Sequence, residues 1–187
     1  MSDIMHEIEI RRARRALDTE PVREDILRRI MEAAVLAPSC FNNQPWRFLV
    51  VTGEEHLSKI HANLPGANYW VKKAPVVVAV AVRKEDDCTL SDGRDYAFFD
   101  AALAVMNLVL QATHEGLIAH PIAGYKPVEI KEALGIPQDY TLITLVALGH
   151  PGDESHLNEK HLELEHSKRD RKPLEEVVFR NTWAAKE

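Results

Sequence analysis

The chain has 187 residues, of which 45% are hydrophobic and 28% charged, with a formal net charge of −6. This length and composition suit one compact domain over residues 1–187, with a sizeable core. The negative charge argues against a nucleic-acid-binding or anionic-membrane surface spread over the whole molecule. The N-terminus lacks the apolar core of a signal peptide, and no apolar run approaches the roughly 20 residues of a membrane-spanning helix. We therefore expect a cytoplasmic protein with no membrane or nucleic-acid partner.

The first half of the chain predicts helix, strand, helix and strand. Residues 22–36 carry apolar side chains at helical spacing behind a Pro, which predicts an amphipathic helix. Residues 47–52 and 75–83 are runs rich in β-branched residues and predict strands. Between them, residues 54–64 have helical spacing.

The second half continues the alternation of helices and strands. Residues 95–116 are apolar almost all round and predict a long central helix that ends at Gly116. After the short segment 117–125, a helix is expected at 127–135 and a strand at 141–149. From residue 152 the chain is polar and charged up to an apolar end at 177–179, which suggests that this tail docks on something.

The two cysteines, Cys40 and Cys88, are far apart in sequence and fit neither a disulfide framework nor a zinc site. A reducing cytoplasm is the simplest compartment for them. Cys40 follows a predicted helix end, where a small packing residue is favoured over an activated thiolate.

The histidines at 156, 161 and 166 recur every five residues. Five steps turn an α-helix by about 140° from its starting face, and an odd step changes the face of a strand. The three side chains therefore cannot converge on one ion from a regular element, and no metal site is expected.

Arginine is the available phosphate ligand. The chain has eight Gly and neither a dinucleotide-binding glycine pattern nor a P-loop pattern. Cationic clusters stand at residues 11–15 and 168–172, and guanidinium groups bind phosphate oxygens bidentately. Taken alone, each cluster is better explained as a solvated charged surface.

Residues 37–48, APSCFNNQPWRF, place amides and a hydroxyl between the first helix and the first strand. A capped helix end and a Pro-stiffened turn account for the prolines and for Trp46 as a core residue. The polar side chains have no such local role, and they suit a ligand with a polar rim and an apolar face.

The sequence resembles the nitroreductase family of FMN-dependent flavoproteins over nearly its whole length. An Arg-Arg-x-x-Arg signature, a P-S-x-x-N-x-Q-P-W-x-F motif, the segment PIAGY at 121–125 and the basic motif at 169–178 occur in the family's order. The residues that carry the first two motifs are Arg11, Arg12, Arg15, Pro38, Ser39, Asn42, Gln44, Pro45, Trp46 and Phe48.

The resemblance implies roles for individual residues. Arg11 and Arg12, with Arg169 and Arg171, would bind the FMN phosphate, and Arg15 would lie near N1 and O2 of the isoalloxazine. Ser39, Cys40 and Asn42 would reach the flavin from the partner subunit, and Pro38 and Gln44 are also expected to bind the cofactor. Ile122, Ala123 and Gly124 would line the ring, with the Ala123 N–H near N5. The expected walls of the acceptor site are Phe41, Tyr69, Trp70 and Tyr125, for which ordinary core or surface packing is an equal alternative.

The resemblance also implies an α+β fold with three layers, α-β-α, around a mainly antiparallel sheet. Two chains would form a homodimer in which residues 152–187 reach the partner, and a strand near residues 177–179 would be exchanged between the sheets. The expected reaction is ping-pong transfer of electrons from NAD(P)H through FMN to a nitroaromatic, a quinone or a similar small acceptor.

The chain departs from the family pattern at Ala13 and Cys40, where Ser is common, and at Ala123, where some relatives carry an acid. Two other functions remain open at this stage. One is a flavin-binding dimer without robust turnover, acting as a sensor or carrier. The other is a binding module that uses its basic patch and no flavin.

Overall fold

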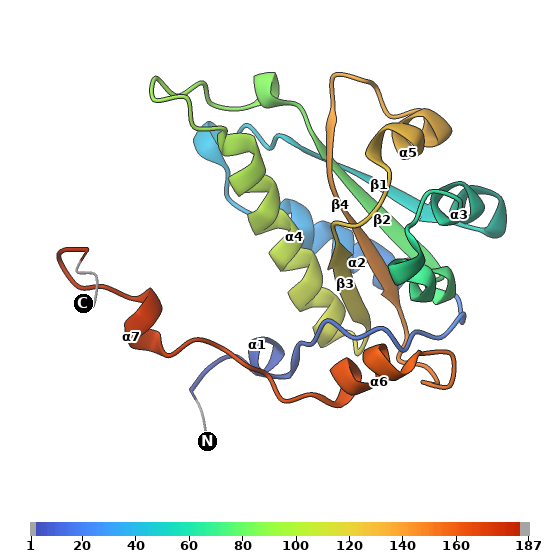
Figure 1. Ribbon diagram of the computed structural model, residues 1–187. Helices are drawn as coiled ribbons and strands as arrows, with labels where there is room; N and C mark the ends of the chain where they lie inside the picture. The colour runs from blue at the N-terminus through green and yellow to red at the C-terminus, as the bar shows by residue number, and fades with distance from the viewer. Residues whose placement is uncertain (1–2, 184–187) are drawn as a thin grey trace.

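The computed structural model describes residues 3–183 and has the α+β composition that the sequence predicts (Figure 1). The helices are α1 His6–Ile10, α2 Glu24–Val35, α3 Glu54–His61, α4 Tyr96–His114, α5 Pro127–Leu134, α6 Glu159–His166 and α7 Leu174–Val177. The strands are β1 Trp46–Thr52, β2 Val76–Val82, β3 Ile118–Ile122 and β4 Thr141–Gly149, and 3₁₀ turns occupy η1 Cys40–Asn42, η2 Gly66–Lys73 and η3 Lys84–Asp86.

The four strands form one antiparallel sheet in the order β1-β2-β4-β3. β2 is the sequence VVVAVAV, and every residue in it is buried. A strand that is apolar on both faces suits a central position between two helical layers. β2 accordingly pairs with β1 on one side and with β4 on the other, with Val78 opposite Val146.

Helices cover both faces of the sheet, which confirms the three-layer arrangement (Figure 1). One face packs Val77 and Ala79 of β2 against side chains of α3, η2 and α5. The other face packs Val78 and Val80 against α2 and α4. Alternate residues of the same strand therefore enter two different cores, as the period of a β-strand requires.

α4 is the central helix of the second layer. It has 19 residues and is long and apolar enough to cross a membrane, which corrects the expectation that no apolar run approaches that length. Its Ala104, Leu108 and Ala112 are fully buried. They lie in the cores against α2 and the sheet, as expected of a core helix in a layered fold.

Arg29 of α2 ties this helix to the end of α4. Its guanidinium donates two hydrogen bonds of 2.8 Å to the carboxylate of Glu115. The guanidinium lowers the pKa of Glu115 to about 2. The α2–α4 pair is therefore fixed at the end of α4 that lies nearest the N-terminal arm.

The polar tail folds back on the body before it leaves it. The polar sequence did not predict the helix α6, which buries the side chains of His161 and Glu165. In the described single chain, residues 177–179 form no strand, because α7 takes up Leu174–Val177 and the extended Val178 lies outside the sheet. Figure 1 shows α7 and the following residues projecting from the body beyond α1.

Candidate functional site

Four arginines from the two ends of the chain meet beside α1. Arg169 donates to the backbone oxygens of Ile8 (3.1 Å) and Glu9 (2.8 Å) and to that of Arg11, and Arg12 donates to the backbone oxygen of Ser167. These contacts bring the two basic segments of the sequence together.

Among the described residues, no ion pair neutralises the positive charge of this cluster. Burial, and then the charges of Arg169, Arg171 and Arg12, lower the pKa of Arg11. Within residues 3–183, the guanidinium of Arg11 has no hydrogen bond or ion pair. A half-buried guanidinium surrounded by other cations is a strong site for an anion such as phosphate.

Glu165 of α6 holds the backbone next to this cluster. Its carboxylate is 3% exposed and accepts the N–H of Arg15 at 3.0 and 3.2 Å and that of Ala16 at 3.4 Å. Arg14 lies 3.9 Å from the same carboxylate and also donates to the backbone oxygen of Glu165. The sequence analysis missed Glu165 because a Glu in a charged tail carries no local signal of burial.

Behind Arg15 lies a buried aromatic pair. The ring of His120 in β3 is 4.5 Å from that of Trp70, and the Arg15 guanidinium lies 5.8 Å from the centre of the Trp70 ring. His120 Nδ1 is 2.9 Å from the backbone oxygen of Arg14, so the Nδ1–H tautomer donates this bond. Burial lowers the pKa of His120 to about 4, which keeps the ring neutral beside two arginines. The position of His120 in the middle of an apolar segment is the one sequence signal that indicates its burial.

The residues after β3 are open to solvent. Ile122 is buried, whereas Ala123 and Gly124 are exposed at the end of the strand. Asn68 donates to the backbone oxygen of Gly124 at 2.7 Å, and a Cβ on Gly124 would lie 2.9 Å from that amide nitrogen. Glycine therefore permits this close approach, which fixes the backbone at the segment expected to line the flavin ring.

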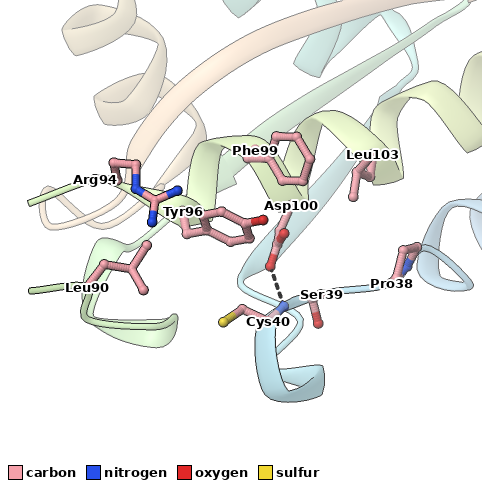
Figure 2. A pocket seen from close by; sticks show the side chains of 9 residues that line it. All are labelled: Pro38, Ser39, Cys40, Leu90, Arg94, Tyr96, Phe99, Asp100 and Leu103. Carbon is pink, nitrogen blue, oxygen red and sulfur yellow. Dashed lines mark hydrogen bonds between the residues drawn. The ribbon is translucent and has the colours of Figure 1, made fainter. Parts of the chain in front are cut away.

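The polar loop after α2 lies at the other end of α4. The Cys40 N–H donates to the buried carboxylate of Asp100 at 2.7 Å, as Figure 2 shows, and the Gln44 N–H donates to Ser39 Oγ at 3.0 Å. Phe41 (φ 48°), Asn42 (φ 59°) and Gln44 (φ 52°) all adopt left-handed backbone conformations. Such conformations are costly for residues other than glycine and cluster at functional sites.

Cys40 and Cys88 form a disulfide, with Cα atoms 6.2 Å apart. The expectation that these two cysteines form no disulfide, and that Cys40 is a small packing residue, is therefore wrong. Their separation of 48 residues gave no local signal, and the fold brings them together by placing the turn after β2 beside η1. Cys40 therefore links the candidate loop covalently to Cys88.

Of the four aromatic residues expected around an acceptor, Phe41 is 92% exposed. Trp70 is 1% exposed and belongs to the core, which corrects its assignment as a wall of an open site. Tyr69 accepts the Asn158 N–H at 2.7 Å and lies 3.2 Å from His161, and Tyr125 donates to the backbone oxygen of Leu142 at 2.9 Å. Tyr69 and Tyr125 are half-buried and have structural partners.

The three regularly spaced histidines of the tail have different environments. His161 stacks on Tyr69, and His166 Nε2 lies 2.7 Å from the carboxylate of Glu154. His156 Nε2 is buried without a hydrogen-bond partner in the described structure.

The arginine cluster and the loop at 38–44 lie at opposite ends of α4. Asp100 near the start of α4 holds Cys40, whereas His114 at its end lies 2.8 Å from Glu7 of α1. At 1.5 Å per residue, Asp100 and His114 are about 21 Å apart along the helix. One chain therefore presents two separate half-sites.

The residues present fit FMN. The guanidinium cluster suits its phosphate, Arg15 adds a cation beside Trp70, and the second half-site offers hydroxyl, amide and backbone groups. Together they form a polar and cationic frame for a flat ligand with a phosphorylated tail.

Comparisons with known proteins agree with this arrangement. The chain is 31% identical over 157 residues to a putative NADH dehydrogenase/NAD(P)H nitroreductase of Methanothermobacter thermautotrophicus, covering 81% of this chain and 78% of that protein. It is 27% identical over 199 residues to an FMN reductase of Bacillus subtilis that uses NAD(P)H, covering 98% of this chain and 75% of the relative.

A solved structure described as an oxidoreductase containing FMN superposes with a TM-score of 0.86 at 31% identity, covering 100% of this chain and 96% of the other. The family model described as the Nitroreductase family matches residues 8–150. That match includes the first arginine segment, the loop at 38–44 and the end of β3. The chain belongs to the Nitroreductase family.

Proposed function

We propose that this protein is an FMN-dependent oxidoreductase that takes electrons from NAD(P)H and passes them, in ping-pong order, to a small acceptor such as a nitroaromatic or a quinone. The observation that carries the proposal is the cluster of Arg11, Arg12, Arg169 and Arg171, which lacks a neutralising anion within the described chain. Membership of the family and the names of the relatives support the cofactor and the electron donor.

The arginine cluster would hold the phosphate of FMN. Arg169 donates hydrogen bonds to backbone oxygens of α1 and so fixes the geometry of the cluster. The guanidinium of Arg11 remains available to bind the phosphate. A guanidinium that is already positioned and partly desolvated binds phosphate with little loss of side-chain entropy.

Arg15 would place a fixed positive charge at the N1 and O2 edge of the isoalloxazine. Its backbone is held by Glu165, and its guanidinium rests beside Trp70. FMN, when bound, accepts a hydride from NAD(P)H and gives up the electrons to the second substrate. A preorganised cation near developing negative charge favours the reduced cofactor electrostatically. The exposed N–H of Ala123 would face N5, and the exposed ring of Phe41 would border the acceptor.

Two chains would complete each site. Because the half-sites of one chain are about 21 Å apart along α4, the loop at 38–44 would serve the flavin held by the partner's arginines. Phe99 and Met106 of α4, with Val35 and Leu36 at the end of α2, form an exposed apolar surface between the half-sites. Such a surface suits a homodimer interface.

The assembly would use the chain as a single FMN-binding domain. Within the C-terminal extension at 152–187, α6 packs on its own chain. The segment after α6 would reach the partner, and its apolar residues at 177–179 would join the partner's sheet as an exchanged strand. Of this extension, the structure describes residues up to 183. The cytoplasm is the proposed compartment, since it supplies NAD(P)H.

The test is anaerobic mixing of the FMN-loaded protein with NADH or with NADPH. Loss of the oxidised flavin absorbance before any acceptor is added, and its return when a quinone follows, is expected for ping-pong chemistry. Flavin that neither nicotinamide reduces would contradict the proposal and favour a flavin-binding sensor or carrier.

A further inference from the structure

The Cys40–Cys88 disulfide joins the candidate flavin loop to the segment that follows β2. Both cysteines are half-buried. Cys40 also lines an open pocket of about 460 Å³ together with Leu90, Tyr96 and Phe99 (Figure 2). A small thiol therefore has a route to the Cys40 side of the bond.

The two sulfur atoms have different surroundings. Asn43 Nδ2 donates to Cys88 Sγ at 3.6 Å and to Asp87 Oδ1 at 3.3 Å. A donor beside sulfur stabilises the thiolate, and a stabilised thiolate is the better leaving group in disulfide exchange. Attack from the pocket on Cys40 with release of Cys88 is therefore the favoured direction.

Buried carboxyl groups lie next to this disulfide. Asp87 is 8% exposed, and its Oδ2 has no hydrogen-bond partner among the described residues. One oxygen of Asp87 and the two sulfur atoms lie within 4.8 Å of one another. Burial raises the pKa of Asp100, and the neighbouring Asp87 raises it further.

The cross-link holds a strained turn. Residues Phe41, Asn42 and Gln44 keep their left-handed conformations only while their surroundings enforce them. The contacts that do so include the Cys40 N–H to Asp100, the Gln44 N–H to Ser39, backbone hydrogen bonds within the turn, and the disulfide. Opening the disulfide removes the covalent restraint among them.

We propose that Cys40–Cys88 is a redox-active disulfide, and that its reduction by an external dithiol loosens the turn at residues 39–44 and weakens the binding of FMN. The predicted effect on FMN binding rests on the proposed function. The predicted loosening of the turn rests only on the disulfide and the geometry of residues 39–44. In a reducing compartment, disulfides are generally transient and serve catalysis or redox sensing.

The dithiol supplies all the electrons and protons that reduction of the Cys40–Cys88 disulfide needs. Its thiolate attacks Cys40 Sγ, the sulfur–sulfur bond breaks, and Cys88 leaves with the electron pair. The second thiol of the reductant then displaces Cys40 and closes a cyclic disulfide. The reductant is oxidised by two electrons, and its two protons end on Cys40 and Cys88.

The experiment compares the oxidised holoprotein with the same protein treated with dithiothreitol. Alkylation with a maleimide of known mass counts the thiols, FMN fluorescence gives the dissociation constant, and hydrogen exchange reports on residues 39–44. We expect two new thiols under native conditions, FMN binding weaker by about tenfold, and faster exchange in the turn, all reversed by reoxidation.

Cys88→Ala is the matched variant, because it removes the cross-link and leaves the flavin loop sequence intact. It should bind FMN as weakly as the reduced protein and should not respond to dithiothreitol, which controls for direct effects of the reductant. Asn43→Ala should slow the reduction of the disulfide.

Equal FMN affinity and equal exchange in the two redox states would overturn the inference, as would a disulfide that opens only in denaturant. Failure to bind FMN in either state would instead sink the proposed function. The rate of hydrogen exchange at residues 39–44, compared between the oxidised and reduced flavin-free protein, would then still decide whether the disulfide controls the turn.

Discussion

The carboxylate of Glu165, near the end of α6, accepts the backbone N–H of Arg15 through both of its oxygens, at 3.0 and 3.2 Å. The two residues are 150 positions apart, and this contact fixes the C-terminal helix against the arginine segment. The polar tail is therefore part of the candidate site.

Replacing Glu165 by Ala is expected to leave the N–H groups of Arg15 and Ala16 without their acceptor. Buried donors that lose a charged partner destabilise a protein by about 1–3 kcal/mol, so unfolding should need less denaturant. FMN affinity should fall as well, because Arg15 loses its support. Glu163→Ala, on the exposed side of the same helix, is the control. Equal stability and affinity in the two variants would show that the contact is unimportant.

Replacing Arg11 by Met is expected to have opposite effects on binding and on stability. The variant loses a charged phosphate ligand, and FMN affinity should fall by about 10- to 100-fold. The flavin-free protein should unfold at the same or a higher temperature, because repulsion from Arg12, Arg169 and Arg171 is relieved.

Arg28→Met is the matched control for this charge removal, since Arg28 is exposed on α2 and pairs only with Glu32 among the described residues. It should leave FMN binding unchanged. Flavin-free protein that is strongly destabilised by Arg11→Met would mean that Arg11 has a structural role and would argue against the phosphate site.

His120 gives the protein a defined response to acid. Its folded pKa is lowered from 6.5 to about 4, so the unfolded chain binds the proton first as the pH falls. Stability should therefore decline between pH 6.5 and pH 4 by up to about 3 kcal/mol from this group alone and then level off. The measurement is the difference in unfolding free energy between the wild type and His120→Gln across that range. A difference that does not vary with pH would refute the buried, neutral state of His120.

The exposed face of α4 should be the dimer interface. Met106→Glu places a charge in it and is expected to give monomers in sedimentation experiments, with loss of FMN because each site needs both chains. Val128→Glu adds the same charge to an exposed position of α5, away from this face, and serves as control. A Met106→Glu monomer that binds FMN normally would contradict the two-chain site.

The elements that sequence reasoning predicted well are those with strong local patterns. The helices α2 and α4 and the strands β1 and β2 have amphipathic, wholly apolar or β-branched sequences, and the structure places them within a residue or two of the expected bounds. The loop at 38–44 was singled out because its polar groups had no local role. The roles of the arginines follow from the resemblance to the family, and both assignments stay predictions.

The features that sequence reasoning missed depend on contacts between distant segments. The disulfide joins residues 48 positions apart, and the burial of Glu165 and Asp87 depends on which segments pack over them. The strand expected at 177–179 is one exchanged onto a partner's sheet. In the single chain these residues have no pairing edge, and the exchange stays a prediction.

The most direct test of the FMN site is the visible absorption spectrum of the freshly purified protein, recorded before and after addition of FMN and removal of the excess. The two-chain site predicts a bound flavin spectrum at about one FMN per chain, lost on denaturation and weaker in Arg11→Met. A wild-type protein that stays colourless after FMN is added would contradict the proposed function and would assign the arginine cluster to another anion.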